Sequence, residues 1–364
     1  MHTALNKHAL LASSLLVWAL TGCQLEGETT WPPRAPCEPS TGPVVDTVMF
    51  PPRDRVCADG AATPCPLTVP LHSDEARTVD VSAELDGATF SYLVSHLALP
   101  EATRRSGDVA SGIGADFDGL DSGFGSTLAD ATCEEFGEDH ASAIEPGVTG
   151  IDNVFEALIG TMEGLMDSSE CPAGMRDGCI DARLSEDLRA GRLLMIVEVT
   201  GVDSFEHDPE VNVAMYAVRT TDGSPPALDG DVIAAGQELE TVATLTAPST
   251  GSILHGRLEA SWSELSLPRE RFGYPEQLTR PRLRAAICER GLFHGYLAAL
   301  TPVEAMVEQW TGERAPLGGR IDAETARNVL QAVADVSPSA EDPTVCEHIS
   351  LAYALEAVPA TRRP

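Results

Sequence analysis

The sequence predicts an α+β protein, built mainly on an antiparallel β-sheet or sandwich, with its helices concentrated in the C-terminal third. Two patterns lead to this prediction. Segments rich in alternating, β-branched and aromatic residues crowd the middle of the chain, and segments with apolar residues at helical spacing crowd its end. Because strands and helices do not alternate along the chain, a parallel sheet of βαβ units is disfavoured.

The strands are predicted from residue types and alternation that suit a pleated, half-buried surface. The clearest pair, 192–200 and 211–219, flanks an acidic connection and predicts a hairpin with a long loop. The turn-forming sequence APSTG separates two further strands. The predicted strands are 78–82, 89–99, 192–200, 211–219, 238–246, 253–265 and, as a strand or a short helix, 350–358.

Four helices are predicted, and three of them follow residue 280. Residues 151–166 carry apolar side chains every three or four positions, and Asp152 in the first turn suits the helix dipole. The others are predicted at 281–300, where Pro281 suits the first helical position, at 301–310, and at 322–336, which begins with half of a capping box.

The first 22 residues contain the three parts of a bacterial export signal. A basic start with Lys7 precedes an apolar run at 9–20, which is shorter than the roughly 20 residues that a helix needs to span a bilayer. The sequence Leu-Thr-Gly-Cys that ends at Cys23 resembles the lipobox of bacterial lipoproteins. This resemblance implies cleavage before Cys23, a diacylglycerol on its sulfur and acylation of the new amine. A plain secretory signal followed by a chance cysteine is the alternative.

The same resemblance implies a location and a domain organisation. In Gram-negative lipoproteins an aspartate after the lipidated cysteine favours retention in the inner membrane, and the residue here is Gln24. We therefore expect the outer membrane to hold the protein through its lipid anchor. Residues 23–45 are rich in proline, threonine and glutamate and predict a flexible tether. Residues 46–364 predict one disulfide-bonded, β-rich globular domain with a C-terminal helical part.

The charge of the chain excludes several functions. Lys7 is the only lysine, so the part after residue 22 has 23 arginines against 56 acidic residues, a side-chain balance of −33. Such a surface repels nucleic acid, so no nucleic-acid partner is expected, and it attracts cations. Without lysine, Schiff-base chemistry is excluded. The sequence also lacks a GxSxG elbow, an HExxH motif and a phosphate-binding loop.

Nine cysteines include Cys23, and the remaining eight suit four disulfides in an exported chain. Eight cysteines allow 105 pairings, so the connectivity is not determined. Two close pairs bracket turn sequences, and the remaining two pairs are assigned because two cysteines lie in the last third of the chain. The predicted pairs are Cys57 with Cys65, Cys171 with Cys179, Cys288 with Cys346, and Cys37 with Cys133.

A calcium loop is predicted at Asp116-Phe-Asp118-Gly-Leu-Asp121. Alternate carboxylates with a glycine between them let hard oxygens converge on a cation, and Asp130 and Asp152 could complete the shell. The terminal glutamate of an EF-hand is missing. An acidic, glycine-rich surface loop without an ion is the competing interpretation. Ca²⁺ is thus the one candidate cofactor, and the sequence establishes none.

A second acidic cluster lies between the two clearest strands. Asp203, Glu206, His207 and Asp208 could bind a ligand or a metal ion, or could form a solvated turn.

Five segments together resemble uncharacterised predicted lipoproteins of GC-rich Gram-negative bacteria such as the myxobacteria. They are the LTGC motif, the DFDGLDSG loop, the GIDNVFEAL helix start, the LLMIVEVTGVD strand and the closing CEHISLAYALEAVPA. This resemblance implies export and a shared fold without an activity. We therefore expect a non-enzymatic binding or envelope-interaction module whose partner is a polar ligand, a glycan or a protein. An exported hydrolase with a glycosidase-like pair of carboxylates is the alternative.

Overall fold

The structure is a computed structural model that describes ten stretches of the chain. These are residues 67–69, 77–79, 85–99, 111–119, 133, 139–142, 148–165, 178–268, 277–312 and 321–364. The predicted export signal, Cys23 and the tether lie outside the described residues. So do the predicted site residues Asp121 and Asp130 and the cysteines Cys37, Cys57, Cys65 and Cys171.

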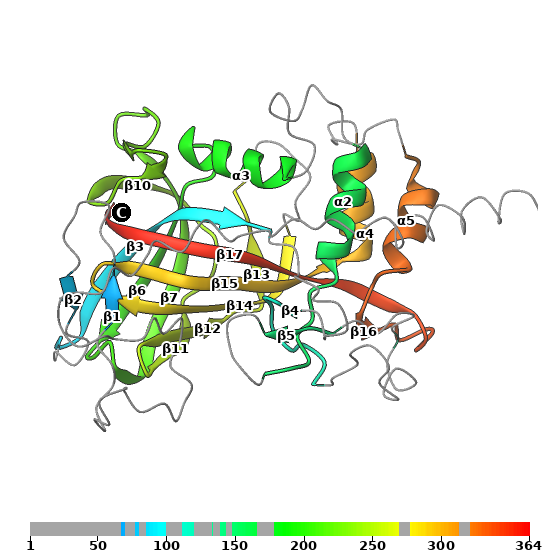
Figure 1. The fold of residues 1–364 in the computed structure, drawn as a ribbon, viewed down its shortest axis with the longest axis horizontal. Helices are drawn as coiled ribbons and strands as arrows, with labels where there is room; N and C mark the ends of the chain where they lie inside the picture. Colours follow the sequence, from blue (N-terminus) through cyan, green and yellow to red (C-terminus); the bar gives the residue numbers. More distant parts are fainter. Residues whose placement is uncertain are drawn as a thin grey trace, which may run out of the picture. The chain divides into compact units, whose positions relative to one another are not determined.

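The described residues form more strands than helices (Figure 1). In chain order the elements are β1 (Leu67–Val69), β2 (Arg77–Val79), β3 (Ala88–Ala98), β4 (Ser111–Gly112), β5 (Ala141–Ser142), α2 (Phe155–Leu165), α3 (Cys179–Arg189), β6 (Met195–Val202), β7 (His207–Thr220), β8 (Leu228–Asp229), β9 (Val232–Ile233), β10 (Gln237–Thr244), β11 (Ser249–Leu254), β12 (Arg257–Ser261), β13 (Glu264–Ser266), β14 (Gln277–Cys288), β15 (Gly291–Pro302), α4 (Val303–Thr311), α5 (Ala323–Gln331), β16 (Val336–Pro338) and β17 (Cys346–Arg363).

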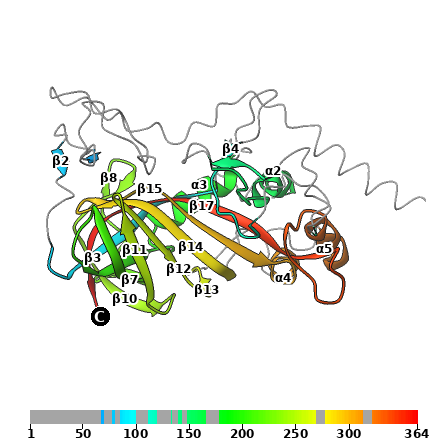
Figure 2. The ribbon, with the colours of Figure 1, turned by 90° about the horizontal axis from the view of Figure 1, so that it is seen from below.

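Eight strands close into an antiparallel barrel (Figure 2). Around the ring they follow the order β3, β6, β7, β11, β12, β14, β15 and β17, and β17 pairs back to β3. Ring neighbours follow one another along the chain, which makes this an up-and-down barrel. Strand β10 lies outside the ring, antiparallel to the end of β7 and parallel to the end of β17. The predicted antiparallel, mainly β architecture is confirmed, but the sheet is a closed barrel and not an open sheet or sandwich.

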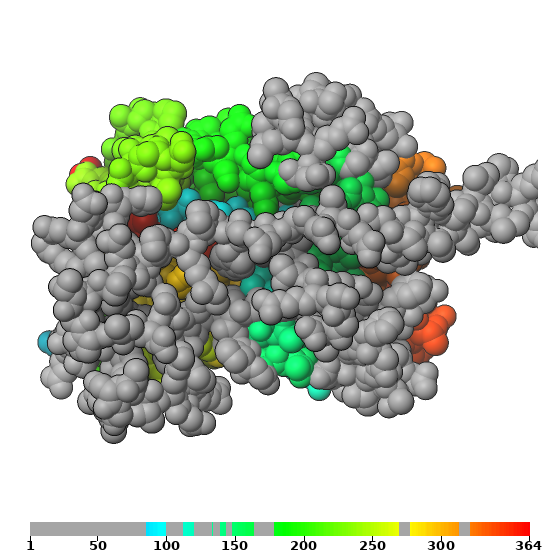
Figure 3. Space-filling view, viewed as in Figure 1, coloured from blue at the N-terminus to red at the C-terminus, as the bar shows by residue number. Residues whose placement is uncertain are grey.

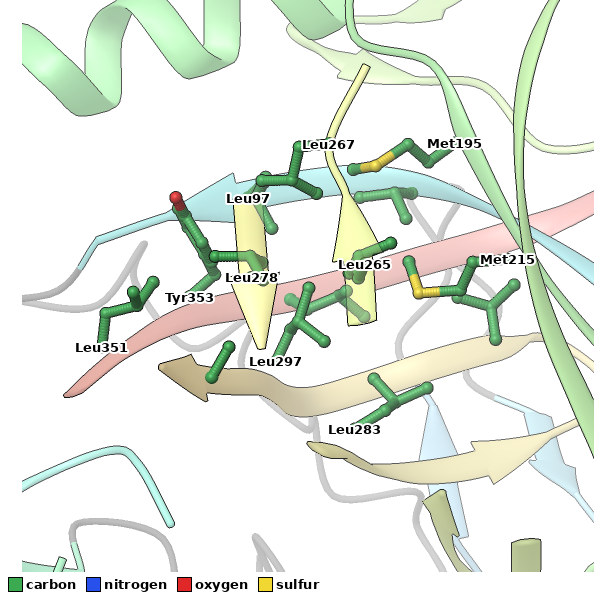
Figure 4. Packing of buried hydrophobic residues seen from close by; sticks show 14 of the residues in the cluster. Leu97, Met195, Met215, Leu265, Leu267, Leu278, Leu283, Leu297, Leu351 and Tyr353 are labelled. Carbon is green, nitrogen blue, oxygen red and sulfur yellow. The ribbon is translucent and has the colours of Figure 1, made fainter. Parts of the chain in front are cut away.

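Alternation along the strands fills the interior of the barrel with apolar side chains. Leu283 of β14 pairs with Leu297 of β15, which pairs with Tyr353 of β17, so these three side chains share one face. All three are at most 1% exposed. Figure 4 shows this packing together with Met195 of β6 and Met215 of β7. An eight-stranded barrel is just wide enough for side chains to fill it.

The outward-facing side chains of β14, β15 and β17 form a second, smaller core. Ala298 pairs with Ala352, one position out of phase with the inward-facing Leu297 and Tyr353, so the two alanines face outward. The segment 111–119 covers this surface with apolar side chains. We call this cluster the outer core; it consists of Ile113, Ala115, Phe117, Ala286, Tyr296, Ala298, Leu300, Val336, Ala352 and Ala354.

The helices are not concentrated in the C-terminal third, which corrects the prediction. Helix α2 confirms a helix within the predicted range 151–166 but begins at Phe155, so Asp152 precedes the helix and does not lie in its first turn. Helix α3 precedes the strand β6 and was not predicted. Helices α4 and α5 pack against each other and against β17. In the space-filling view, the chain around α3 (green) and the β8–β9 excursion (yellow-green) lie together on one face (Figure 3). Among the described residues, no helix has both the length and the apolar character that crossing a bilayer requires.

The segment predicted as a helix at 281–300 is instead the hairpin of β14 and β15. Two glycines explain the difference. A Cβ on Gly295 would lie 2.7 Å from the Cβ of Ala285, and Gly291 has a φ of 150° at the turn. The hairpin requires both positions to be glycine, whereas a glycine inside a helix costs about 1 kcal/mol relative to alanine.

One disulfide corrects two of the predicted pairs, Cys288 with Cys346 and Cys37 with Cys133, whereas the pairs Cys57 with Cys65 and Cys171 with Cys179 include cysteines outside the described residues. Cys133 bonds to Cys346, and Cys288 is a buried free thiol. Cys179 is also disulfide-bonded, and its partner lies outside the described residues. The predicted Cys288–Cys346 bond is impossible in this fold because Cys288 lies near Ala357, far along β17 from Cys346. Eleven strand positions separate Ala357 from Cys346 by about 36 Å, far beyond the reach of a disulfide.

Candidate metal centre

The segment 111–119 brings two aspartates to the edge of the outer core. Phe117 is 5% exposed and packs in that core, and Asp116 and Asp118 on either side of it are half-buried. Gly119 then turns the chain with a φ of 83°, and its amide donates to Oδ1 of Asp116 at 2.6 Å. The alternate aspartates and the glycine therefore form the turn that their spacing predicted.

Asp152 comes from a second segment, just before helix α2. Its backbone forms an isolated antiparallel bridge with Ala115, and its Oδ2 accepts a hydrogen bond from the amide of Phe117 at 2.5 Å. Gly114 allows this close approach, because a Cβ at that position would lie 2.6 Å from the carbonyl oxygen of Asp152. The carboxyl group of Asp152 is thereby held beside the loop.

The three carboxyl groups converge on one point. One ligand oxygen from each of Asp116, Asp118 and Asp152 lies within 4.8 Å of the other two. Oxygens that bind one calcium ion at about 2.3–2.6 Å are at most about 5 Å apart, so this separation fits a shared cation. We call these three residues the aspartate triad. It could hold a metal ion, and the described residues contain no other such group.

The surroundings of Asp152 oppose its negative charge. Burial and, after it, the charges of Asp335, Asp139 and Asp118 raise the pKa of Asp152 to about 10, against the opposing hydrogen bond from the Phe117 amide. The side chain is 1% exposed, and its Oδ1 has no hydrogen-bond partner among the described residues. A buried carboxylate in this position requires either a proton or a cation.

A polar network holds the second segment against the barrel. Ser350 of β17 donates its backbone amide and its hydroxyl to the carboxylate of Asp335, and its Oγ accepts from the amide of Val154 at 2.9 Å. On the other side, Nε2 of the buried His140 lies 3.0 Å from Oε1 of Glu156. These contacts fix the backbone next to Asp152 from two directions.

The prediction is therefore confirmed in its coarser form, as a group of carboxylates that could hold a metal ion. The structure brings Asp116, Asp118 and Asp152 together, whereas Asp121 and Asp130 lie outside the described residues. Sequence reasoning missed Asp139 and Asp335, whose charges act on Asp152. Neither stands in a local ligand pattern, so no sequence signal identified them.

The second acidic cluster is a structural turn. Oδ2 of Asp208 accepts from the amide of Asp203 at 2.7 Å, and its Oδ1 accepts from the amide of Glu210 at 3.2 Å. Oδ1 of Asp203 in turn accepts from the amide of Gly87 at 2.7 Å. These carboxylates bind backbone amides and do not converge on a ligand site.

Comparison with known proteins adds no relative. No protein-family profile matches the chain, and neither the curated proteins nor the solved structures contain a significant match.

Proposed function

We propose that this chain is a non-enzymatic envelope module that binds Ca²⁺ at the aspartate triad and is held at the outer membrane by a lipid on Cys23. The observation that carries the calcium proposal is the buried Oδ1 of Asp152, without a hydrogen-bond partner among the described residues and within reach of two further carboxylates. The sequence resemblance to bacterial lipoproteins supports the anchor.

Calcium suits this donor set better than other common cations. All three ligands are carboxylate oxygens, which are hard donors, whereas zinc sites favour histidine and cysteine. Magnesium keeps several waters in a strict octahedron and is rarely held by the protein alone. Calcium takes six to eight oxygens in a less directional shell, so water could complete a site that begins with three carboxylates.

The burial of the triad favours binding over hydrolysis. A glycosidase places two carboxyl groups on either side of a scissile bond in an open site. Asp152 is 1% exposed and its Oδ2 is already bound to a backbone amide, so it cannot reach a polysaccharide. The triad therefore supports an ion site and offers no support for the hydrolase alternative.

The test is a calcium titration of the mature protein by calorimetry after treatment with EGTA. We expect one saturable site, and we expect Asp118→Asn to weaken the affinity at least tenfold because it removes a charged ligand. The matched control is Asp229→Asn, which makes the same charge change at an exposed position in β8.

Equal affinities in the two variants would show that calcium only screens the acidic surface. Such screening depends on ionic strength and not on one carboxylate, so the titrations are run at matched sodium concentration. In that case the triad would be an ordinary acidic turn and the calcium proposal would be wrong.

A further inference from the structure

We propose that Arg280 and Arg282 are positioning residues for the triad, and that they act by holding the backbone of the aspartate loop and not through their charge. This inference rests on the proposed cation binding at Asp116, Asp118 and Asp152. It assigns a role to two arginines, because a positive charge beside the triad would otherwise oppose the binding of a cation there.

The arginines bind main-chain atoms of the loop. Nη1 of Arg282 donates to the carbonyl oxygen of Asp116 at 2.7 Å, and Nη2 of Arg280 donates to the carbonyl oxygen of Phe117 at 2.9 Å. Two successive carbonyls are thus fixed by two side chains of one strand. The hydrogen bonds orient the peptide units between the two aspartates of the loop, which determines where their carboxylates lie.

The same guanidinium groups also hold the ring of Phe117. The Cζ atom of Arg282 lies 4.8 Å from the ring centroid and that of Arg280 lies 5.5 Å from it, within the range of a cation–π contact. Phe117 separates the two aspartates in sequence and anchors the loop in the outer core. Each arginine therefore contacts the loop through both the main chain and the aromatic ring.

The strand β14 is irregular where these arginines stand. Its register with β15 shifts between Thr279 and Arg282, and Arg280 has a φ of 51°. This left-handed conformation is unfavourable for a residue with a side chain, so the surrounding contacts must maintain it. The irregularity places two neighbouring arginines within reach of the same loop.

Charge and positioning predict opposite effects of mutation. A positive charge near the triad repels calcium, so its removal would tighten binding if charge were all that mattered. If the arginines position the loop, their removal weakens binding, and lysine cannot replace them because it lacks the planar fork and stacks less well on a ring.

The experiment measures calcium affinity and Tb³⁺ luminescence lifetimes in H₂O and D₂O for Arg282→Met, Arg282→Lys and Arg280→Lys. Arg284→Met is the matched control, because Arg284 belongs to the same strand and its Nη2 lies 2.9 Å from Oε1 of Glu259 in β12. The melting temperature in EGTA verifies that each variant is folded.

We expect both Arg282 variants to bind calcium about tenfold more weakly or worse, as outer partners of metal ligands often do when mutated. We also expect about one additional water on bound Tb³⁺, because a misplaced carboxylate leaves a coordination position to solvent. General destabilisation without misplacement would not change that water count. Arg284→Met should retain the affinity and the water count of the parent protein.

Tighter binding by Arg282→Met together with parental binding by Arg282→Lys would overturn the proposal in favour of a charge effect. Unchanged affinity and water count in all arginine variants would also overturn it. If the parent protein itself binds no calcium in the calorimetric titration, the proposed function fails first. That result is distinguishable, because it does not depend on any arginine variant.

Discussion

At the residue scale, Asp152 shows how a fold can place a carboxyl group where its ionised form is unfavourable. The bridge to Ala115 and the hydrogen bond from the amide of Phe117 hold the carboxyl group beside the outer core. Nearby aspartates add repulsion to the cost of burial. Burial and repulsion thus favour the protonated form of the group when no cation is bound, and a bound cation would have to displace that proton.

The raised pKa of Asp152 predicts that the stability of the protein depends on pH in the absence of calcium. The pKa of Asp152 is about 10 in the folded chain and about 4 in an unfolded one, so unfolding between these values releases a proton. The contribution is fully present below about pH 4 and is lost as the pH rises towards 10, by up to about 1.4 kcal/mol per pH unit. Urea unfolding in EGTA at pH 6 and pH 8 measures it.

The variant Asp152→Asn tests whether Asp152 causes this pH dependence, because asparagine imitates the protonated acid. We expect this variant to be more stable than the parent protein at pH 8 in EGTA and to lose both the pH dependence between 6 and 8 and the stabilisation by calcium. Asp229→Asn should keep both. If the parent protein and Asp152→Asn changed stability equally between pH 6 and 8, Asp152 would not be the group responsible.

At the element scale, the β14–β15 hairpin shows why a short apolar segment is ambiguous. The residues 281–300 are apolar at spacings that fit a helix, and Pro281 suits a helix start. The barrel decides otherwise, because strand pairing buries one face inside and the other in the outer core. Along β15 and the end of β14 both faces are then buried, so the alternation that identifies a half-buried strand is lost there and survives only in the first part of β14.

The same hairpin contains the free thiol of Cys288, and its burial predicts how that thiol reacts. Cys288 ends β14 fully buried, and burial raises the pKa of its thiol. We expect this thiol to resist alkylation in the folded protein and to react after unfolding without reductant. Mass spectrometry of the alkylated peptides measures it. If Cys23 carries a lipid, seven cysteines remain besides Cys288, so one more must lack an intramolecular partner.

Detection of Cys288 in a disulfide would contradict this prediction. Cys179 is the internal control, because it is disulfide-bonded and should remain unmodified until reductant is added.

At the scale of the whole molecule, β17 connects the barrel to the segments that surround the triad. It closes the barrel against β3, carries Ser350 next to the triad, and begins at Cys346, whose disulfide reaches Cys133. That disulfide anchors the chain between the aspartate loop and Asp139. A cation at the triad would add a second cross-link between the outer segments that pack on this strand.

The anchoring of the whole molecule has its own test. We expect Cys23→Ser to abolish incorporation of labelled palmitate and to release the protein from membrane fractions, because the thioether requires the sulfur. Cys37→Ser, the same change outside the lipobox, should stay with the membrane. Persistence of the Cys23→Ser protein in the membrane pellet after a high-salt wash would show that the lipid anchor is wrong.

The sequence by itself determined the features that depend on neighbouring residues. The strands β3, β6 and β7, the helices α2, α4 and α5, and the turn from Asp116 to Gly119 follow from local periodicity, capping and turn chemistry. Asp322 caps α5 as its position predicted, since its side chain accepts from the amide of Thr325. Such signals survive in a sequence because the interacting groups are only a few residues apart.

Only the tertiary structure decided the closure of the barrel, the disulfide partner of Cys346 and the burial of Asp152. Each depends on which segments meet after the chain has folded. Asp118, Asp152 and Asp335 are far apart in sequence, yet the charges of the other two act on Asp152 once 111–119 and β17 both contact the residues just before α2. Period-two alternation shows which residues of one strand share a face. Which distant strands become neighbours is set by the collective packing of both cores.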